Sequence, residues 1–123
     1  MSTTLVVTTI NPPNAAMHAL AAGCIENGWD FVVAGDSKSP ADFSLEGCRF
    51  LSLASQRESG FSLGGKCPDR SYTRKNIGYL AAMRAGAKVI VETDDDNHPR
   101  RDFWSTRRIE VQCRPVETDG WVN

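Results

Sequence analysis

The fold is decided by residues 5–26, LVVTTINPPNAAMHALAAGCIE, which join a β-branched apolar run to a segment rich in helix formers. The run Leu5 to Ile10 suits a buried strand, and the prolines after it fix the direction of the connecting loop. Asn14 stands where a cap would begin a helix from Ala15 to Glu26, and Asn27-Gly28 would end it. The apolar residues that share one face of this helix are Met17, Leu20, Ala21 and Cys24. These residues predict a strand, a loop and a helix, in that order.

Strand-like and helix-like segments continue to alternate along the chain. Three further apolar runs predict strands: Trp29 to Ala34, Cys48 to Leu53 and Ala87 to Val91. A helix is expected from Tyr72 to Ala85, with Ile77, Leu80, Ala81 and Met83 facing inward. Residues 54–72 look like a long loop, and Ile109 to Cys113 is a candidate last strand. The pattern predicts an α/β class with a Rossmann-like, mainly parallel sheet of about four to five strands flanked by helices.

Composition and charge limit the function classes. The chain has 123 residues, 41% hydrophobic and 24% charged, which is typical of one domain spanning residues 1–123. A net charge of -1 argues against a general nucleic-acid partner. No apolar run suggests a membrane segment or a signal peptide, and the four cysteines lack a metal-binding spacing. We therefore expect a soluble, cytoplasmic-type chain with reduced thiols, and homo-oligomers could form by pairing an open sheet edge.

Polar residues follow the predicted strands, and they would gather at the carboxyl edge of the sheet, where ligands of such folds bind. Thr8 and Thr9 end the first strand and could donate hydrogen bonds to a nucleoside. Asp36 ends the second strand and could accept a hydrogen bond from a base or ribose, although it is equally well explained as a turn former. The topology thus predicts a binding site at this edge.

Three consecutive acids, Asp94, Asp95 and Asp96, directly follow the fourth predicted strand. Their mutual repulsion is relieved by a divalent cation, and Mg²⁺ or Mn²⁺ prefers carboxylate and phosphate oxygens. In an extended segment Asp94 and Asp96 project to the same side while Asp95 points away, so we predict Asp94 and Asp96 as metal ligands. The alternative is a solvated turn.

Basic residues lie just before this strand in the sequence. Lys66, Arg70, Arg74 and Lys75 could neutralise a diphosphate, helped by the free N–H groups of the helix start. The alternative is that they are solvated charges beside a helix.

Four stretches carry a resemblance to a known family: VVTTINPP, FVVAGDSKSP, RKNIGYLAAMRAGAKVIVETDDDN and HPRRDFW. Together they resemble the amino-terminal half of STELLO-type glycosyltransferase-like proteins. More broadly, the chain is similar to nucleotide-diphospho-sugar transferases of the GT-A fold. The resemblance implies a Rossmann-like sheet whose Asp-x-Asp motif binds Mn²⁺ or Mg²⁺ and a UDP- or GDP-linked sugar.

The same resemblance implies roles for individual residues. Thr9, with Thr8 beside it, and Asp36 would lie around the nucleoside. Arg74 or Lys75 would lie near the base or phosphates, and the segment from Asp94 through Asp95 to Asp96 at the ribose and metal. In this fold the acceptor site and catalytic base come from segments after the acidic motif, and only residues 97–123 follow it here. The chain would then be the donor-binding part of a glycosyltransferase, apparently an incomplete domain, with acceptor and base unassigned. The alternative is a non-catalytic nucleotide-binding or assembly module.

Overall fold

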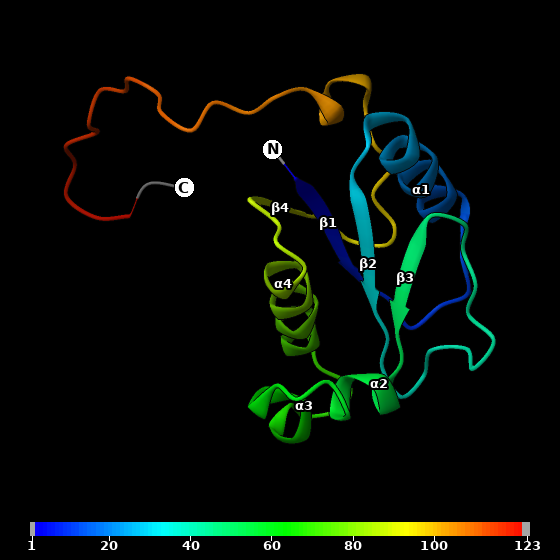
Figure 1. Ribbon diagram of the computed structural model, residues 1–123. Helices are drawn as coiled ribbons and strands as arrows, with labels where there is room; N and C mark the ends of the chain where they lie inside the picture. Colours follow the sequence, from blue (N-terminus) through cyan, green and yellow to red (C-terminus); the bar gives the residue numbers. More distant parts are fainter. Residues whose placement is uncertain (1, 122–123) are drawn as a thin grey trace.

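Four parallel strands form the centre of the computed structural model, which describes residues 2–121 (Figure 1). The strands are β1 (Thr3–Thr8), β2 (Asp30–Ala34), β3 (Cys48–Leu51) and β4 (Val89–Glu92). They lie in the order β3-β2-β1-β4, and Leu5 of β1 pairs with Phe31 on one side and with Val91 on the other. The predicted α/β class and parallel sheet are confirmed, with four strands in the described part of the chain.

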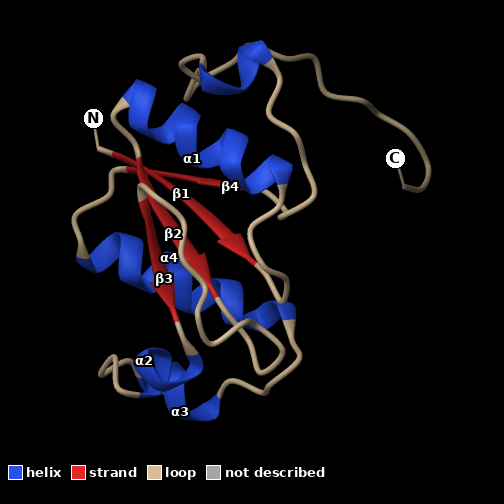
Figure 2. Ribbon diagram, turned by 90° about the vertical axis from the view of Figure 1, so that its right-hand side faces the viewer, coloured by secondary structure: helices blue, strands red, loops and turns tan. Residues whose placement is uncertain are grey.

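One long helix covers each face of the sheet, as Figure 2 shows. These helices are α1 (Ala15–Asn27) and α4 (Lys75–Arg84). At the start of α1 the Asn14 side chain accepts a hydrogen bond from the Met17 N–H at 2.9 Å. The helix ends at Gly28, whose φ of 65° is left-handed and costs glycine no steric strain. The cap and the stop predicted for α1 are therefore confirmed.

Alternate residues of β1 supply two separate cores, because successive side chains of a strand point to opposite faces of the sheet. Leu5 and Val7 belong to the cluster under α1, and Val6 belongs to the cluster under α4. All three side chains are fully buried. The strand is thus apolar without interruption because both of its faces are covered.

The inward face predicted for α1 is buried as expected, whereas the face predicted for α4 needs one correction. Ile77 and Ala81 are buried, but Met83 is 59% exposed. The buried stripe of α4 includes Gly78, where an added Cβ would lie 2.5 Å from Val6 Cγ1. α4 thus packs on β1 through the face that carries Gly78, and Met83 lies outside this buried face.

The segment expected as a loop over residues 54–72 is largely helical, so that prediction is wrong. It contains two short helices, α2 (Leu53–Arg57) and α3 (Ser62–Lys66), and the 3-10 helix η1 (Tyr72–Arg74) begins at its end. Gln56 of α2 is fully buried, and its side-chain Nε2 donates to the carbonyls of Gly35 and Leu51 at 2.8 Å each. These bonds tie the polar segment to the ends of β2 and β3.

After β4 the chain crosses the α1 side of the sheet and forms a second 3-10 helix, η2 (Arg101–Trp104). The rings of Trp29, Phe103 and Trp104 pack together, with Trp29 and Trp104 centroids 5.2 Å apart. These three rings are partly buried and pack against the core cluster under α1.

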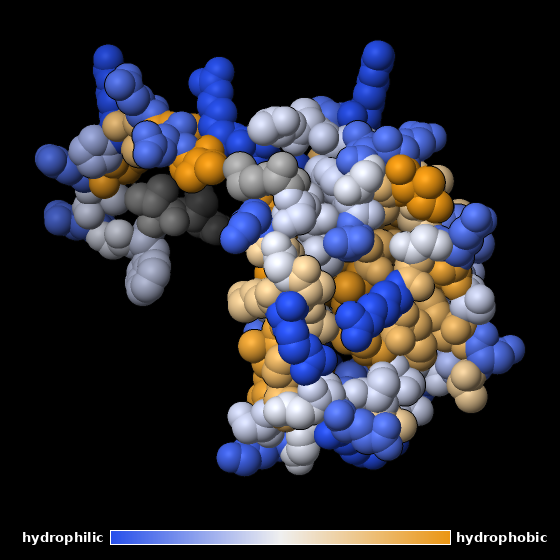
Figure 3. All heavy atoms as spheres, viewed as in Figure 1, coloured by the Kyte–Doolittle hydropathy of each residue, from blue (hydrophilic) through white to orange (hydrophobic). Residues whose placement is uncertain are grey.

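Residues 105–121 extend from the body of the molecule without a helix or a strand. In Figure 3 this segment stands apart, with apolar and charged side chains mixed along it. The strand predicted from Ile109 to Cys113 is therefore wrong: Ile109 is 86% and Val111 69% exposed. The alternation of apolar residues is present, but no strand within residues 2–121 supplies backbone partners to this segment. Nowhere in residues 2–121 does a helix combine the length and apolar character needed to traverse a bilayer.

The strand order brings the polar strand ends together. The chain runs from β1 to β2 on one side of β1 and later returns to β4 on its other side. Such a reversal leaves a crevice outside the carboxyl ends of the strands, which is where open α/β sheets bind ligands.

Candidate functional site

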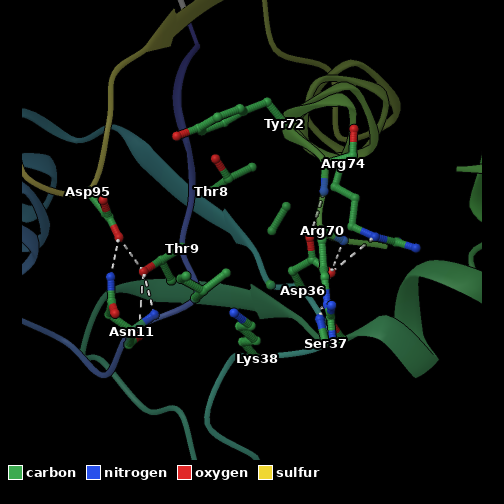
Figure 4. A pocket seen from close by; sticks show the side chains of 14 residues that line it. Thr8, Thr9, Asn11, Asp36, Ser37, Lys38, Arg70, Tyr72, Arg74 and Asp95 are labelled. Carbon is green, nitrogen blue, oxygen red and sulfur yellow. Dashed lines mark hydrogen bonds and ion pairs between the residues drawn. The ribbon is translucent and has the colours of Figure 1, made fainter. Parts of the chain in front are cut away.

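A cleft of about 320 Å³ opens at the carboxyl edge of the sheet (Figure 4). It is lined by residues 8–11 at the end of β1, residues 34–38 of β2 and its loop, residues 70–72, Arg74, and Asp95 after β4. Its size lies at the lower end of the range of about 300–1,000 Å³ seen for small-molecule sites. It could hold a nucleoside, with the rest of a larger ligand projecting over the rim.

The ends of β1 and β4 are joined by hydrogen bonds to one carboxylate. Thr9 donates from Oγ1 to Asp95 Oδ2 at 2.6 Å, and Asn11 donates from Nδ2 to the same oxygen at 3.3 Å. Asn14 Nδ2 donates to the Asp95 backbone carbonyl at 3.0 Å. The Asp95 carboxylate therefore lies at the cleft, on a different side of the acidic turn from Asp94, which contacts Lys75.

The carboxylate of Asp36, at the end of β2, stabilises the opposite wall of the cleft through hydrogen bonds. Its Oδ1 accepts from the N–H groups of Ser37 and Arg70 at 2.6 and 2.9 Å, and its Oδ2 accepts from Ser71 N–H at 3.1 Å. Burial raises the pKa of Asp36, but these N–H groups and the Arg74 charge outweigh it and hold the pKa below its ordinary value. This carboxylate thus fixes the backbone of residues 70–71 beside β2.

Arg74 lies behind that wall and is almost completely buried, with 1% of its surface exposed. Its guanidinium donates to Gln56 Oε1 at 2.7 Å, to the Cys67 carbonyl at 2.9 Å and to Asp69 Oδ1 at 2.7 Å. Its Nε lies 3.7 Å from Asp36 Oδ1 and has no hydrogen-bond partner in the described part of the chain. Arg74 therefore joins α2, the chain before η1 and the end of β2.

Lys75, the next residue, points instead to the acidic side of the site. Its Nζ lies 2.7 Å from Glu92 Oε2 and 3.1 Å from Asp94 Oδ1. Partial burial lowers the pKa of Lys75, but the bonds and charges of Glu92 and Asp94 outweigh it and hold the pKa above its ordinary value. Lys75 thus stays a cation and neutralises part of the acidic cluster.

The acidic cluster forms a turn, not the extended segment expected from the sequence. Asp95 and Asp96 lie in the turn, and the Asn97 N–H donates to the Asp94 carbonyl at 3.3 Å. As a result, Asp94 meets Lys75, Asp95 meets Thr9, and Asp96 is exposed and accepts no side-chain hydrogen bond among residues 2–121.

A metal ion held by protein groups alone does not match this arrangement. Over residues 2–121, no three His, Cys, Asp or Glu side chains are grouped to hold one. Mg²⁺, however, commonly uses one or two protein carboxylates and fills its other positions with water and substrate phosphate. Asp94 and Asp96 are both exposed at this turn, and Lys75 already pairs with Asp94, so a cation shared with a diphosphate at these two residues stays a prediction.

The structure places the predicted site residues in two groups. The first group lines the cleft and consists of Thr8, Thr9, Asp36, Arg70, Arg74 and Asp95. The second lies beside the cleft and consists of Lys75, Asp94 and Asp96. Lys66, expected to neutralise phosphate, is exposed on α3 and does not line the cleft.

Several cleft residues carried no prediction as site residues, among them Lys38 and Tyr72. Lys38 follows Asp36 in a loop, and Tyr72 stood at the expected start of a helix. Tyr72 joins the site through the fold of residues 53–74, which the sequence pattern did not indicate, and Lys38 joins it through the loop that follows β2.

Comparison with known proteins gives two similar plant sequences. No family profile matches the chain. It is 44% identical over 68 residues to "Probable glycosyltransferase STELLO1" of Arabidopsis thaliana and 41% identical over 68 residues to "Probable glycosyltransferase STELLO2" of the same plant. Each match covers 55% of this chain and 9% of the relative. The resemblance to STELLO-type glycosyltransferase-like proteins is thus confirmed over about half of the chain, and the chain contains a glycosyltransferase-like segment.

Proposed function

We propose that this chain binds the donor of a metal-dependent glycosyltransferase, a UDP- or GDP-linked sugar. One observation carries the proposal: a nucleoside-sized cleft and an acidic turn meet at the carboxyl edge of a parallel sheet in a glycosyltransferase-like chain. The nucleoside would occupy the cleft, and the diphosphate would extend over Asp95 towards Asp94 and Asp96. This direction keeps the phosphates near the exposed acids and a shared cation.

Each residue of the site would have its own role in binding the donor. Thr8 and the backbone around Gly35 form the floor beneath the nucleoside. Thr9 keeps its hydroxyl on Asp95 and so holds the acidic turn against the end of β1. Lys75 supplies a fixed positive charge next to Asp94. The chain's own contribution is therefore to bind and orient the donor.

Asp94 and Asp96 are the residues that would hold Mn²⁺ or Mg²⁺ together with the diphosphate oxygens. Such a cation, when bound, offsets the negative charge that grows on the diphosphate as the glycosyl bond breaks. The Lys75 ammonium group bonds both Glu92 and Asp94. When a cation occupies Asp94, Lys75 would keep its bond to Glu92 and bond a phosphate oxygen in place of Asp94.

A second candidate is a nucleotide-binding or assembly module without transfer activity. The observation that favours it is the ion pair between Lys75 and Asp94 at 3.1 Å, which already neutralises one proposed metal ligand. In this module the acidic turn would stabilise the edge of the sheet and would need no cation. The two candidates differ in one measurable property, the metal dependence of nucleotide binding.

Isothermal titration calorimetry with UDP and with GDP tests the proposal, first with Mn²⁺ and then with a chelator. We expect binding that needs the metal and is weakened more than about tenfold in Asp96→Ala. The matched control is Asp119→Ala, which removes an exposed acid from the extended segment 105–121 and leaves binding unchanged. Binding that is equal with metal and chelator would support the second candidate as a nucleotide-binding module, and a wild-type protein that binds neither nucleotide would refute the proposal and leave only the assembly module.

A further inference from the structure

Tyr72 is the one large aromatic side chain on the rim of the cleft, and 83% of its surface is exposed. In Figure 4 its ring extends from η1 across the opening of the cleft, over Thr8. The other aromatic rings near the sheet are at least partly buried, as in the Trp29, Phe103 and Trp104 cluster. An aromatic ring left in water beside a cleft offers a large apolar face to a ligand.

The backbone beneath this ring is held firmly although the ring itself is free. Asp36 accepts hydrogen bonds from Arg70 N–H and Ser71 N–H at 2.9 and 3.1 Å. The Ser71 side chain caps η1 by accepting from Thr73 N–H at 3.2 Å. On the other side of Tyr72, Arg74 is anchored by its buried guanidinium. The backbone from which the ring extends is therefore fixed before any ligand arrives, which lowers the entropy cost of binding.

The hydroxyl of Tyr72 has no hydrogen-bond partner in the part of the chain that the structure describes. Tyr79 provides a contrast, because its hydroxyl lies 3.3 Å from Glu92 Oε2. Since neither its ring nor its hydroxyl stabilises the fold, the face of Tyr72 is left for a ligand. The cleft beside it, about 320 Å³, has room for a flat ring against that face.

We infer that Tyr72 is the stacking platform for the base of the bound nucleotide. The inference rests on the proposed function, because it assigns the planar part of that ligand to one wall of the cleft. It also sets the orientation: the base lies between Tyr72 and the Asp36 wall, and the phosphates point towards Asp95. Stacking uses the π-face and not the hydroxyl, so phenylalanine can replace tyrosine at this position.

Three proteins test this inference: the wild type, Tyr72→Ala and Tyr72→Phe. Titration calorimetry in the presence of Mg²⁺ measures binding of UDP and of pyrophosphate, which has the phosphates but no base. We expect Tyr72→Ala to bind UDP about 5- to 150-fold more weakly, and Tyr72→Phe to bind it within about twofold of the wild type. Pyrophosphate should bind equally to all three proteins. Because the side chain is exposed, circular dichroism should show the same fold in each.

Fluorine NMR gives a readout that a purely structural role would not change. The protein has two tyrosines, Tyr72 and Tyr79, so labelling with 3-fluorotyrosine gives two signals, which Tyr72→Phe assigns. The Tyr72 signal should shift on addition of UDP and stay in place with pyrophosphate.

Two outcomes would overturn the inference while the proposed function stands. One is equal UDP affinity of Tyr72→Ala and the wild type, and the other is an equal loss of UDP and pyrophosphate binding in Tyr72→Ala. A wild-type protein that binds no UDP at all would instead refute the proposed function, and the stacking role with it.

Discussion

Arg74 and Lys75 are neighbouring cations whose removal should affect different properties. Replacing Arg74 should lower the stability of the fold, and replacing Lys75 should weaken nucleotide binding. Replacing Arg74 by methionine keeps the volume of the side chain but removes its charge and its three hydrogen-bond partners. Gln56 Oε1, which is fully buried, would lose its partner, and that alone costs about 1–3 kcal/mol. The nearby Asp36 carboxylate, only 10% exposed, would lose its compensating charge. We expect a total loss of about 3–5 kcal/mol, the range for a broken buried ion pair.

Lys75→Met is the matched control for this prediction. Lys75 also pairs with two carboxylates, but the side chains of Glu92 and Asp94 are 55% and 58% exposed. Ion pairs to exposed partners contribute about 0–1 kcal/mol. We therefore expect Lys75→Met to stay within about 1 kcal/mol of the wild type while weakening nucleotide binding.

Urea denaturation followed by circular dichroism and tryptophan fluorescence measures both variants. The slope of the free energy of unfolding against urea should be unchanged, so that a shift in midpoint reports stability. If Arg74→Met lost less stability than Lys75→Met, the reasoning that Arg74 serves the fold would be refuted.

The pH dependence of stability tests the other member of this network, Asp36. Its folded-state pKa lies below the ordinary value of 3.8, so Asp36 stabilises the fold above that pH. The contribution is lost as the pH falls through the folded-state pKa. The gap in free energy of unfolding between the wild type and Asp36→Asn should therefore shrink on acidification below pH 3.8. A gap that stayed constant over this pH range would show that the charge of Asp36 is not what matters.

Two further predictions concern packing and thiol reactivity. Gly78→Ala should be about 1–3 kcal/mol less stable than Gly65→Ala in urea denaturation. The added Cβ at position 78 would lie 2.5 Å from the buried Val6, whereas nothing lies within 4 Å of a Cβ at position 65. Equal stabilities of the two variants would contradict this packing. Native protein treated with iodoacetamide should be alkylated first at the exposed Cys113. Burial is the main cause that raises the pKa of Cys24 and of Cys48 to about 12, so neither forms the reactive thiolate readily. Peptide mass spectrometry that finds Cys24 or Cys48 modified first would refute this prediction.

The parts of the fold that the sequence predicted are those set by local patterns. Asn14 and Gly28 delimit α1 because capping depends on residues within one helical turn. Strand ends are set by pairing with other strands, so β1 runs over Thr3–Thr8 and not over the predicted Leu5 to Ile10. The alternation from Ile109 to Cys113 is as regular as in a strand, but it has no partner strand. Local pattern thus predicts what a segment can form, and pairing decides whether it does.

The site was predictable to the extent that parallel topology places strand ends together. Thr8, Thr9, Asp36 and Asp95 meet at one cleft for that reason. Two partners of Asp36 are backbone groups 34 and 35 residues away, which no local pattern indicates, whereas the third is the N–H of the adjacent Ser37. This local bond agrees with the turn-forming alternative stated for Asp36, and contact of Asp36 with a ligand stays a prediction.

The segment Tyr72 to Lys75 shows how one turn can serve fold and site at once. In the tight 3-10 turn and the helix that follows, nearby side chains leave the axis in different directions. Tyr72 points over the cleft, Arg74 into the interior, and Lys75 towards the acidic turn. Substitutions at these three positions should therefore separate three effects: loss of base binding, loss of stability and loss of charge near the phosphates. If all three variants lost stability and binding together, the segment would act as one structural unit and the division of roles would be wrong.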